Sequence, residues 1–432
     1  MSYHFTMSRV MDATKELLFS LAFKEMHRMS ETDFSRNRKL GFAEVSTIIL
    51  KGAKRGLHTA VKEASESIRC DVDSYSEAAF CKARRKINYT AFEELCQVSA
   101  KEFYCAATEA KRYQGFRVWA IDGSKINLPT NPATLEEFDS EPFKCGSRAQ
   151  SLASCLYDVL NAVVLDAAME RVDANERELA SRHIAALGKY CEEAGIDKKN
   201  ELITLDRGYP SEELISQIMS AGFRFVARAN KDNFWKEVSG VDTEDAIIQR
   251  GTMQLRVVRV KLAQPEQTVS GKTETMATFL TNLTEEEFSV EDISNLYRLR
   301  WKIETNYGFL KSRIELENFT GLSPLCLRQD FYAALYLSNL IACMKYDTAA
   351  DAAQYSRDKK YEYKLNYTEA YRELRKDIFD LVLCDSRSSF YYAYRKLRKR
   401  ICETLIPIRD NRHPKRGRPR TGARFFHNHK PS

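Results

Sequence analysis

Paired cysteines and long apolar runs are missing from this sequence. Its 11 cysteines include no C-x-x-C pair, so neither a zinc site nor a disulfide framework is indicated, and reduced thiols are expected. No uninterrupted apolar stretch approaches the roughly 18 residues that a membrane span requires. The first residues also lack the basic segment and apolar run of a secretory leader. We therefore expect a cytoplasmic protein without a membrane partner.

The composition is that of a folded, mildly basic chain. Hydrophobic residues make up 44% and charged residues 29% of the 432 residues, and the formal net charge is +7. A chain of this length is too long for one compact core and suggests two to four domains at roughly 100 to 200 residues each. The excess of positive charge suits a polyanion such as a nucleic acid.

Residues 1–113 are predicted to form a helical DNA-binding region, because apolar positions recur every three or four residues and glycine and proline are rare. One helix in this region is predicted to begin with a capping box of Ser74 and Glu77. The basic residues of this helix are Lys82, Arg84, Arg85 and Lys86. They indicate either a DNA-contacting helix or an ordinary solvated basic face.

The hydrophobic period changes in residues 114–345, where strands alternate with helices. This alternation predicts an α/β domain with a mixed sheet. Within it, residues 232–288 show strand patterns without an intervening helix, which we interpret as a β-rich insertion. A long helix is expected over residues 289–311. Residues 346–432 are predicted to be helical and to end in a basic tail.

Two aspartates each follow a short apolar strand. The run 118–121 ends at Asp122, and the run 202–205 ends at Asp206. Ligands gather at the carboxyl ends of strands in α/β sheets, where a carboxylate is partly desolvated unless it meets a cation or a hydrogen-bond donor. An aspartate at a strand end is also a common turn former, so neither residue alone indicates a site.

One face of the helix expected over residues 289–311 combines a tyrosine, two cations and a carboxylate. At about 100° per residue, Tyr297, Arg300, Glu304 and Lys311 fall within roughly 60° of one another. An ordinary solvated face with an Arg300–Glu304 pair is one interpretation. The other interpretation is that these four residues, the stripe, form part of a functional site. The two strand-end aspartates favour this second interpretation.

Three carboxylates from separate elements, Asp122, Asp206 and Glu304, could hold two Mg²⁺ or Mn²⁺ ions, since hard cations prefer oxygen ligands. Such a pair of ions performs phosphodiester chemistry: one activates a water or a 3′-hydroxyl, and the other stabilises the leaving oxygen. Arg300 and Lys311 would then contact phosphate instead of merely balancing the acids. Tyr297 could add a hydroxyl contact.

Other acidic residues compete for these roles. Four acids lie near predicted strand ends, and each could support a metal ligand or replace one of the three. They are Asp158, Asp166, Glu170 and Glu176. Glu315 and Glu317 rival Glu304 as a third ligand, but they follow the expected end of the helix and lie outside its stripe.

The spacing Y-x2-R-x3-E-x6-K, formed by Tyr297, Arg300, Glu304 and Lys311, resembles the signature of DDE transposases of bacterial insertion sequences, in the insertion-sequence-four family. Asp122 in AIDGSKINLP resembles the first aspartate of that family. Asp206 in LITLDRGYPS resembles the second, with the Asp-x-Gly-Tyr pattern that commonly surrounds it. The first motif has a serine where threonine is frequent, and the hydroxyl is kept.

The resemblance implies an RNase H-like catalytic core with a β-rich insertion before the glutamate helix. It also implies a function: binding transposon-end inverted repeats, cleaving them, and joining the freed 3′-hydroxyls to target DNA. The implied metal ligands are Asp122, Asp206 and Glu304. The implied contacts to transposon-end DNA are Tyr297, Arg300 and Lys311. The family further implies a homodimer in the synaptic complex and a bacterial, nucleoid-associated location.

The C-terminal segment PKRGRPR, residues 414–420, resembles an AT-hook, whose arginines follow the narrow minor groove of A·T-rich DNA. On this interpretation Arg416, Arg418 and Arg420 contact DNA. A simple electrostatic tail is the alternative, and either would add salt-dependent affinity.

The sequence therefore predicts a metal-dependent DDE transposase. Two other functions stay open. A decayed or repurposed copy would bind DNA ends without cutting them, and a metal-dependent nuclease would cut without joining.

Overall fold

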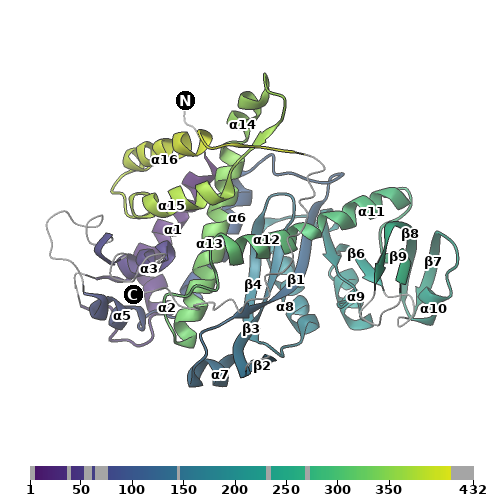
Figure 1. Ribbon diagram of the computed structural model, residues 1–432, viewed down its shortest axis with the longest axis horizontal. Coiled ribbons are helices and arrows are strands. Elements are labelled where there is room, and N and C mark those ends of the chain that lie inside the picture. The colour runs from purple at the N-terminus through teal and green to yellow at the C-terminus, as the bar shows by residue number, and fades with distance from the viewer. Residues whose placement is uncertain are drawn as a thin grey trace.

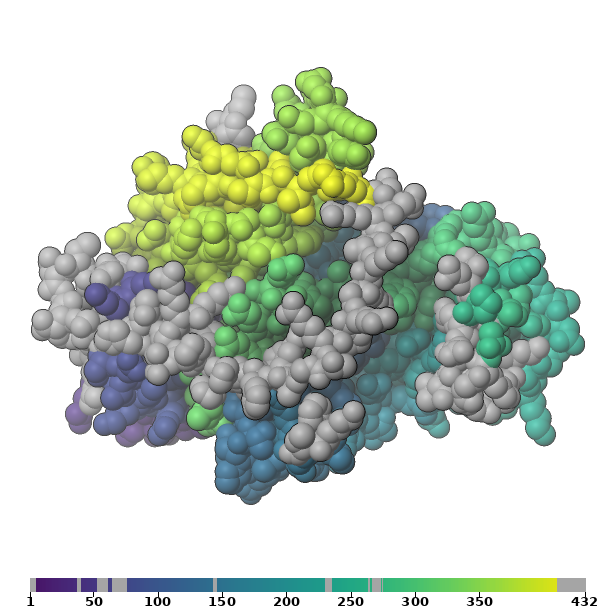
Figure 2. Space-filling model, in the orientation of Figure 1, coloured from purple at the N-terminus to yellow at the C-terminus, as the bar shows by residue number. Residues whose placement is uncertain are grey.

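The computed structural model describes residues 5–36, 40–52, 61–63, 76–143, 146–229, 235–267 and 273–409. Helices from both ends of the sequence gather on one side of a central sheet, and the late strands lie on the other side (Figure 1). In Figure 2 the yellow and light green C-terminal helices form an exposed layer over the upper part of the molecule. Among the described helices, not one combines the length and hydropathy needed to cross a bilayer.

The sheet is built around β1 (Arg117–Asn127). On one side, β1 pairs antiparallel with β3 (Gly146–Asp158), which pairs antiparallel with β4 (Val163–Arg171). On the other side lie β5 (Glu201–Leu205) and β6 (Arg224–Ala229), both parallel to β1. The order β4-β3-β1-β5-β6, with β3 alone running in the opposite direction, is the RNase H-like arrangement. The predicted α/β class with a mixed sheet is confirmed.

The two inner strands form because their side chains are apolar and fully enclosed. Every residue from Val118 to Ile121 is 0% exposed, as are Leu202, Ile203 and Leu205. Such uninterrupted apolar runs are typical of parallel strands covered on both faces. Helix α8 (Glu176–Ala194) connects β4 to β5, and helix α9 (Glu212–Ser220) connects β5 to β6.

Three further strands extend this sheet beyond β6. β9 (Thr273–Thr281) pairs antiparallel with β6, and β8 (Met253–Gln267) and β7 (Asp245–Arg250) follow. The strands expected within residues 232–288 thus continue the same sheet. The division of the chain into regions 1–113, 114–345 and 346–432 stays a prediction.

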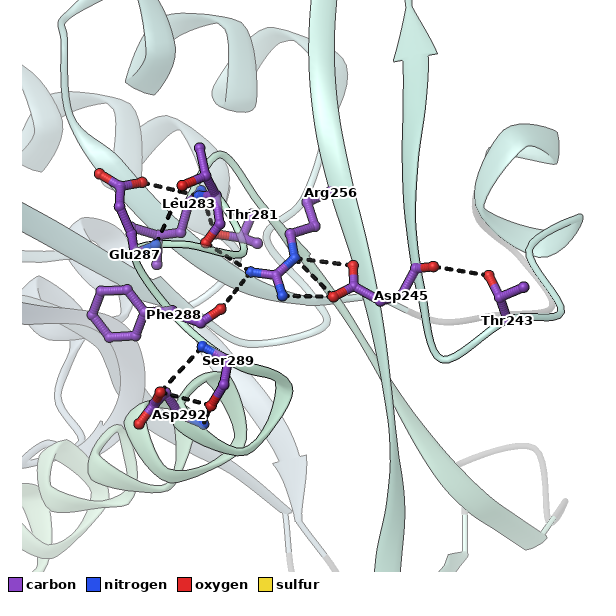
Figure 3. Close-up of polar contacts among 10 residues, drawn as sticks. Thr243, Asp245, Arg256, Thr281, Leu283, Glu287, Phe288, Ser289 and Asp292 are labelled. Atoms are coloured by element: carbon purple, nitrogen blue, oxygen red, sulfur yellow. Dashed lines mark hydrogen bonds and ion pairs between the residues drawn. The ribbon is translucent and has the colours of Figure 1, made fainter.

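Arg256 of β8 anchors the chain where it leaves the sheet (Figure 3). Its buried guanidinium pairs with Asp245 of β7 at 2.6 Å and donates to the carbonyls of Thr284 at 2.9 Å and Phe288 at 2.6 Å. The next residue, Ser289, caps α11 (Val290–Leu299) in a capping box with Asp292. The start of α11 is therefore fixed to the sheet.

The central helix of the helical side is α13 (Pro324–Asp347), most of whose residues are buried. It packs against β4, α6 (Thr90–Ala106), α1 (Thr6–Phe19) and α3 (Phe42–Lys51). The remaining elements are α2 (Leu21–His27), α5 (Glu77–Arg84), α7 (Pro132–Phe138), β2 (Ser140–Phe143), η1 (Lys198–Asn200), α10 (Lys236–Ser239), α12 (Trp301–Ser312), α14 (Ala349–Ser356), β10 (Tyr363–Lys364), α15 (Tyr367–Val382), α16 (Arg387–Cys402) and β11 (Ile406–Pro407).

Helix α5 differs from its prediction at two points. Ser76 caps it, with its side chain accepting from the Ala79 N–H, so the predicted N-cap at Ser74 is wrong, and Ser74 itself lies outside the described residues. Arg84 is 3% exposed and donates to Gln329 at 2.6 Å and Asp330 at 2.8 Å. All three guanidinium nitrogens of Arg84 donate within the fold and join α5 to α13, which leaves no free donor for a phosphate.

Replacing Arg84 by methionine should lower the free energy of unfolding by about 3 to 5 kcal/mol, because it leaves the Asp330 carboxylate buried without its partner. Lys82→Met, at an exposed position of the same helix, should change it by less than about 0.5 kcal/mol. Urea denaturation of both variants measures the difference. Equal midpoints for the two variants would show that the buried pair does not stabilise the fold.

Candidate active site

Asp122 and Asp206 lie side by side because of the register between β1 and β5. Ile121 pairs with Leu205 in this parallel ladder, so the two aspartates follow at the same level. Asp206 follows the end of β5 as predicted, but β1 continues to Asn127 through its pairing with β3, so the prediction that a strand ends at Asp122 is wrong. Both are partly buried. The structure therefore brings together the two carboxylates that the apolar runs mark in the sequence.

The helix expected over residues 289–311 is in fact two helices, and the prediction of one continuous helix is wrong. α11 ends at Leu299 and α12 begins at Trp301, with α12 packed on β1 (Figure 1). At the junction, the Arg300 N–H donates to the Tyr297 carbonyl, and the Ile303 N–H donates to the Arg300 carbonyl. These bonds span three residues and tighten the turn.

The side chain of Arg300 lies among the three predicted carboxylates. It is 4% exposed. Its Nη2 donates to Glu304 Oε1 at 2.9 Å, and its Nη1 lies 3.7 Å from Asp122 Oδ2. Within the described part of the chain, Nε and Nη1 have no hydrogen-bond partner. The guanidinium thus carries unused donors next to the acids.

Tyr297 and Lys311 complete the predicted stripe. The Tyr297 hydroxyl donates to Asp206 Oδ1 at 3.0 Å, and the Arg300 guanidinium lies over its ring at 5.5 Å. Lys311 Nζ donates to Ser124 Oγ at 2.8 Å, two residues beyond Asp122 on β1. Tyr297, Arg300 and Lys311 therefore contact an aspartate or the strand that carries Asp122, and Glu304 is joined to them through Arg300. The C-terminal Arg416, Arg418 and Arg420 lie outside the described residues.

The two aspartates have opposite electrostatic environments. Burial raises the pKa of Asp122 to about 6, and Arg300 offsets this only in part, since Glu304 and Asp206 add negative charge. Burial also acts to raise the pKa of Asp206, but Arg300, the Arg207 N–H and the Tyr297 hydroxyl outweigh it and lower this pKa. Of the two aspartates, Asp122 is therefore the more easily protonated near neutral pH.

The donor set fits a hard divalent cation by type and charge. Three carboxylates face one guanidinium, so the site keeps net negative charge when all are ionised, and carboxylate oxygens are the ligands that Mg²⁺ prefers. Within the described residues, no three acidic, histidine or cysteine side chains lie close enough to hold a metal as they stand. The Arg300 guanidinium occupies the space that they share.

Two tyrosines at the site were not predicted as functional residues. The Tyr307 hydroxyl lies 2.9 Å from the Asp122 carbonyl and 3.2 Å from that of Ala153, and it joins the glutamate helix to β1 and β3. Tyr209, in the Asp-x-Gly-Tyr pattern, is 2% exposed. That pattern was a signal for Tyr209. For Tyr307 the only signal is its position one turn after Glu304.

Most of the competing acids have partners of their own. Asp158 accepts from Tyr104 at 2.6 Å, Asp166 lies 2.7 Å from His183, and Glu170 pairs with Arg182 at 2.9 Å. Glu317 accepts from the Asn127 side chain at 3.1 Å. These contacts account for the four residues as structural partners, and none of them is with Arg300.

Residues 113–340 match the family model described as "Transposase DDE domain". Because this match spans more than half of the chain, the protein belongs to the family of proteins with a transposase DDE domain. It is a DDE transposase by family, and such enzymes depend on divalent metal ions.

Two further comparisons add little to this assignment. No curated protein sequence matches the chain. Among solved structures, the chain is similar to the piggyBac transposase in a cryo-EM structure of its synaptic complex with hairpin DNA. That similarity has a TM-score of 0.47 and 9% sequence identity, and it covers 90% of this chain and 84% of the other.

The raised pKa of Asp122 predicts a pH-dependent stability of the metal-free protein. A folded-state pKa of about 6 lies above the value near 3.9 expected when unfolded, so the ionisation of Asp122 costs free energy that grows from about pH 4 to pH 6 and is fully present above about pH 6. Asp122→Asn should therefore stabilise the protein by roughly 1 to 3 kcal/mol at pH 8, and this gain should vanish toward pH 4.

The control for this prediction is Asp206→Asn. Because the pKa of Asp206 is lowered, its charge stabilises the fold at neutral pH, and that contribution is lost only as the pH falls below about 4. Asp206→Asn should thus destabilise the protein where Asp122→Asn stabilises it. Thermal melts in the presence of a chelator, from pH 4 to pH 8, measure both; effects of the same sign would contradict the assignment.

Proposed function

We propose that this protein is a transposase of the insertion-sequence-four family that binds transposon-end inverted repeats, cleaves them and joins the 3′-hydroxyl ends to target DNA. The observation that carries the proposal is the contact of one buried arginine with carboxylates from two separate elements, Asp122 and Glu304, beside Asp206. The complete Y-x2-R-x3-E-x6-K spacing around that arginine favours this family.

In this proposal Asp122, Asp206 and Glu304 hold the divalent metal, as two Mg²⁺ or Mn²⁺ ions. When bound, the metal supplies an activated water or 3′-hydroxyl and stabilises the charge that grows on the phosphate and the leaving oxygen. The residues of the chain position this chemistry. Tyr297 fixes Asp206 through its hydroxyl, and Tyr307 fixes the backbone of Asp122.

Arg300 and Lys311 are proposed to bind the DNA backbone beside the scissile phosphate. Arg300 has two buried nitrogens without partners among the described residues, and a phosphate would satisfy them with charge-assisted bonds. Burial lowers the pKa of Lys311, with Glu317 opposing the effect. An incoming phosphate would restore the preference for the charged form.

The remaining regions are proposed to bind DNA around this core. Residues 1–113 would contact the transposon end, and the basic tail with Arg416, Arg418 and Arg420 would follow an A·T-rich minor groove. Two DNA ends must be held together for transposition, which favours a homodimer. A nucleoid-associated location would follow from these contacts.

A strand-transfer assay tests the proposed function. The purified protein is incubated with Mg²⁺, a supercoiled target and a labelled duplex that carries the inverted repeat flanking its own gene. Joined strands are expected from the natural protein, whereas Asp122→Asn, Asp206→Asn and Glu304→Gln should abolish cleavage and leave duplex binding intact. The control is Glu178→Gln, an exposed acid of α8, which should keep full activity.

Each other outcome of that assay identifies an alternative. Nicks without joined strands would favour a nuclease, and binding without cleavage would indicate a decayed copy. Full activity in any one of the three carboxylate variants would remove that residue from the proposed metal site.

The proposed DNA contacts predict a change in the salt dependence of binding. Lys311→Ala should weaken binding and reduce the slope of log K against log salt by about 1, because one phosphate contact is lost. Removing residues 412–432 should reduce the slope further, most on A·T-rich duplex. The control is Lys189→Ala, at an exposed position late in α8. If both variants show the same salt dependence, Lys311 does not contact a phosphate and is an ordinary solvent-exposed lysine.

A further inference from the structure

A fourth carboxylate, that of Glu176, reaches the strand that carries Asp122. Glu176 is the first residue of α8, which follows β4 and which Asn175 caps. A Cβ atom placed on Gly123 would lie 2.7 Å from Glu176 Oε1 and 3.2 Å from Leu152 Cδ1. The Glu176 carboxylate therefore lies directly against the backbone next to Asp122, in space that only a glycine leaves free.

The same turn of α8 is attached to the loop that carries Asp206. The Arg177 side chain donates through Nε to the Gly208 carbonyl at 3.1 Å. The Tyr209 N–H in turn donates to the Asp206 carbonyl at 3.1 Å. The start of α8 is thus attached to the loop that carries Asp206, while its Glu176 side chain lies against the strand that carries Asp122.

Tyr209 supplies an independent observation that points to a ligand. Its side chain is 2% exposed, and its hydroxyl has no hydrogen-bond partner within the described part of the chain. Burial raises the pKa of Tyr209, and the negative charges of Glu176, Asp122 and Asp206 raise it further. A buried hydroxyl without a partner costs free energy, so a ligand at this point would satisfy it.

We infer that Glu176 is a fourth carboxylate of the metal site, and that it supplies an oxygen to the divalent cation either directly or through a water that the Tyr209 hydroxyl contacts. This inference rests on the proposed metal-binding role of Asp122, Asp206 and Glu304. It also explains why residue 123 is a glycine, because a side chain at this position would collide with the Glu176 carboxylate.

A purely structural role for Glu176 is also conceivable, because a carboxylate in the first turn of a helix interacts favourably with the helix dipole. Glu178 lies in the same first turn, is exposed and would provide the same effect. It has no contact of this kind with Gly123. The two glutamates therefore form a matched pair that separates metal binding from helix stabilisation.

The experiment measures Mn²⁺ binding to the full-length protein without DNA, from the electron paramagnetic resonance signal of free Mn²⁺ at pH 7.5. Glu176→Gln, which keeps the shape and removes the charge, should weaken Mn²⁺ binding by about 10-fold or more. Glu178→Gln should stay within about twofold of the natural protein. The melting temperature of the metal-free protein, recorded alongside, should be similar for both variants.

Two further variants test the geometry. Glu176→Asp keeps the charge but withdraws the oxygens by one methylene, so it should also weaken Mn²⁺ binding. Gly123→Ala should do the same by displacing the Glu176 carboxylate, and the double variant Gly123→Ala/Glu176→Gln should be no weaker than Glu176→Gln alone. Additive losses would contradict the contact between the two residues.

Equal Mn²⁺ affinity of Glu176→Gln and the natural protein, while Asp122→Asn loses binding, would overturn this inference and leave the proposed active site intact. Absence of Mn²⁺ binding by the natural protein itself would overturn both. If Glu176→Gln and Glu176→Asp both bind Mn²⁺ more weakly than the natural protein while Glu178→Gln binds it equally well, Glu176 is a fourth carboxylate of the metal site.

Discussion

The burial of Arg300 among three acids is the constraint on which the site depends. An arginine that is 4% exposed must be compensated by charge, and Glu304 and Asp122 provide it from a helix and a strand that are distant in sequence. Without the Arg300 charge these acids would be buried without a cationic partner, whereas loss of the Asp122 charge leaves Glu304 and Asp206 beside the guanidinium. The contacts of Arg300 therefore tie α12 to β1, and they set the distance between two of the carboxylates that are proposed to hold the metal.

This arrangement also explains why the two aspartates differ. Arg300, the Arg207 N–H and Tyr297 together lower the pKa of Asp206, whereas Asp122, 3.7 Å from Arg300, is also exposed to the negative charges of Glu304 and Asp206. A divalent cation would reverse that balance, because it would favour the charged form of every carboxylate at the site. In the proposed mechanism, the guanidinium would then be free to bind the DNA backbone.

Local patterns of the sequence predict the parts of the site but not their contacts. The apolar runs before Asp122 and Asp206 predict buried strands, and the helical spacing from Tyr297 to Lys311 predicts a shared face. By contrast, the break at Arg300, the enclosure of Arg84 by α13 and the approach of Glu176 to Gly123 arise from packing between distant segments. The spacing of apolar residues does not indicate such contacts. For this reason the sequence alone cannot distinguish a solvent-exposed arginine on a basic helix from the buried Arg84.

The added strands β7, β8 and β9 help to position Arg300, although they do not carry either aspartate. β9 pairs with β6, and Arg256 on the next strand fixes the carbonyls just before α11. A capped helix that starts from a fixed point on the sheet has few orientations open to it. Since Tyr297 lies near the end of α11 and Arg300 immediately follows it, the guanidinium at the centre of the site takes its position from β8 as well as from the carboxylates that it contacts.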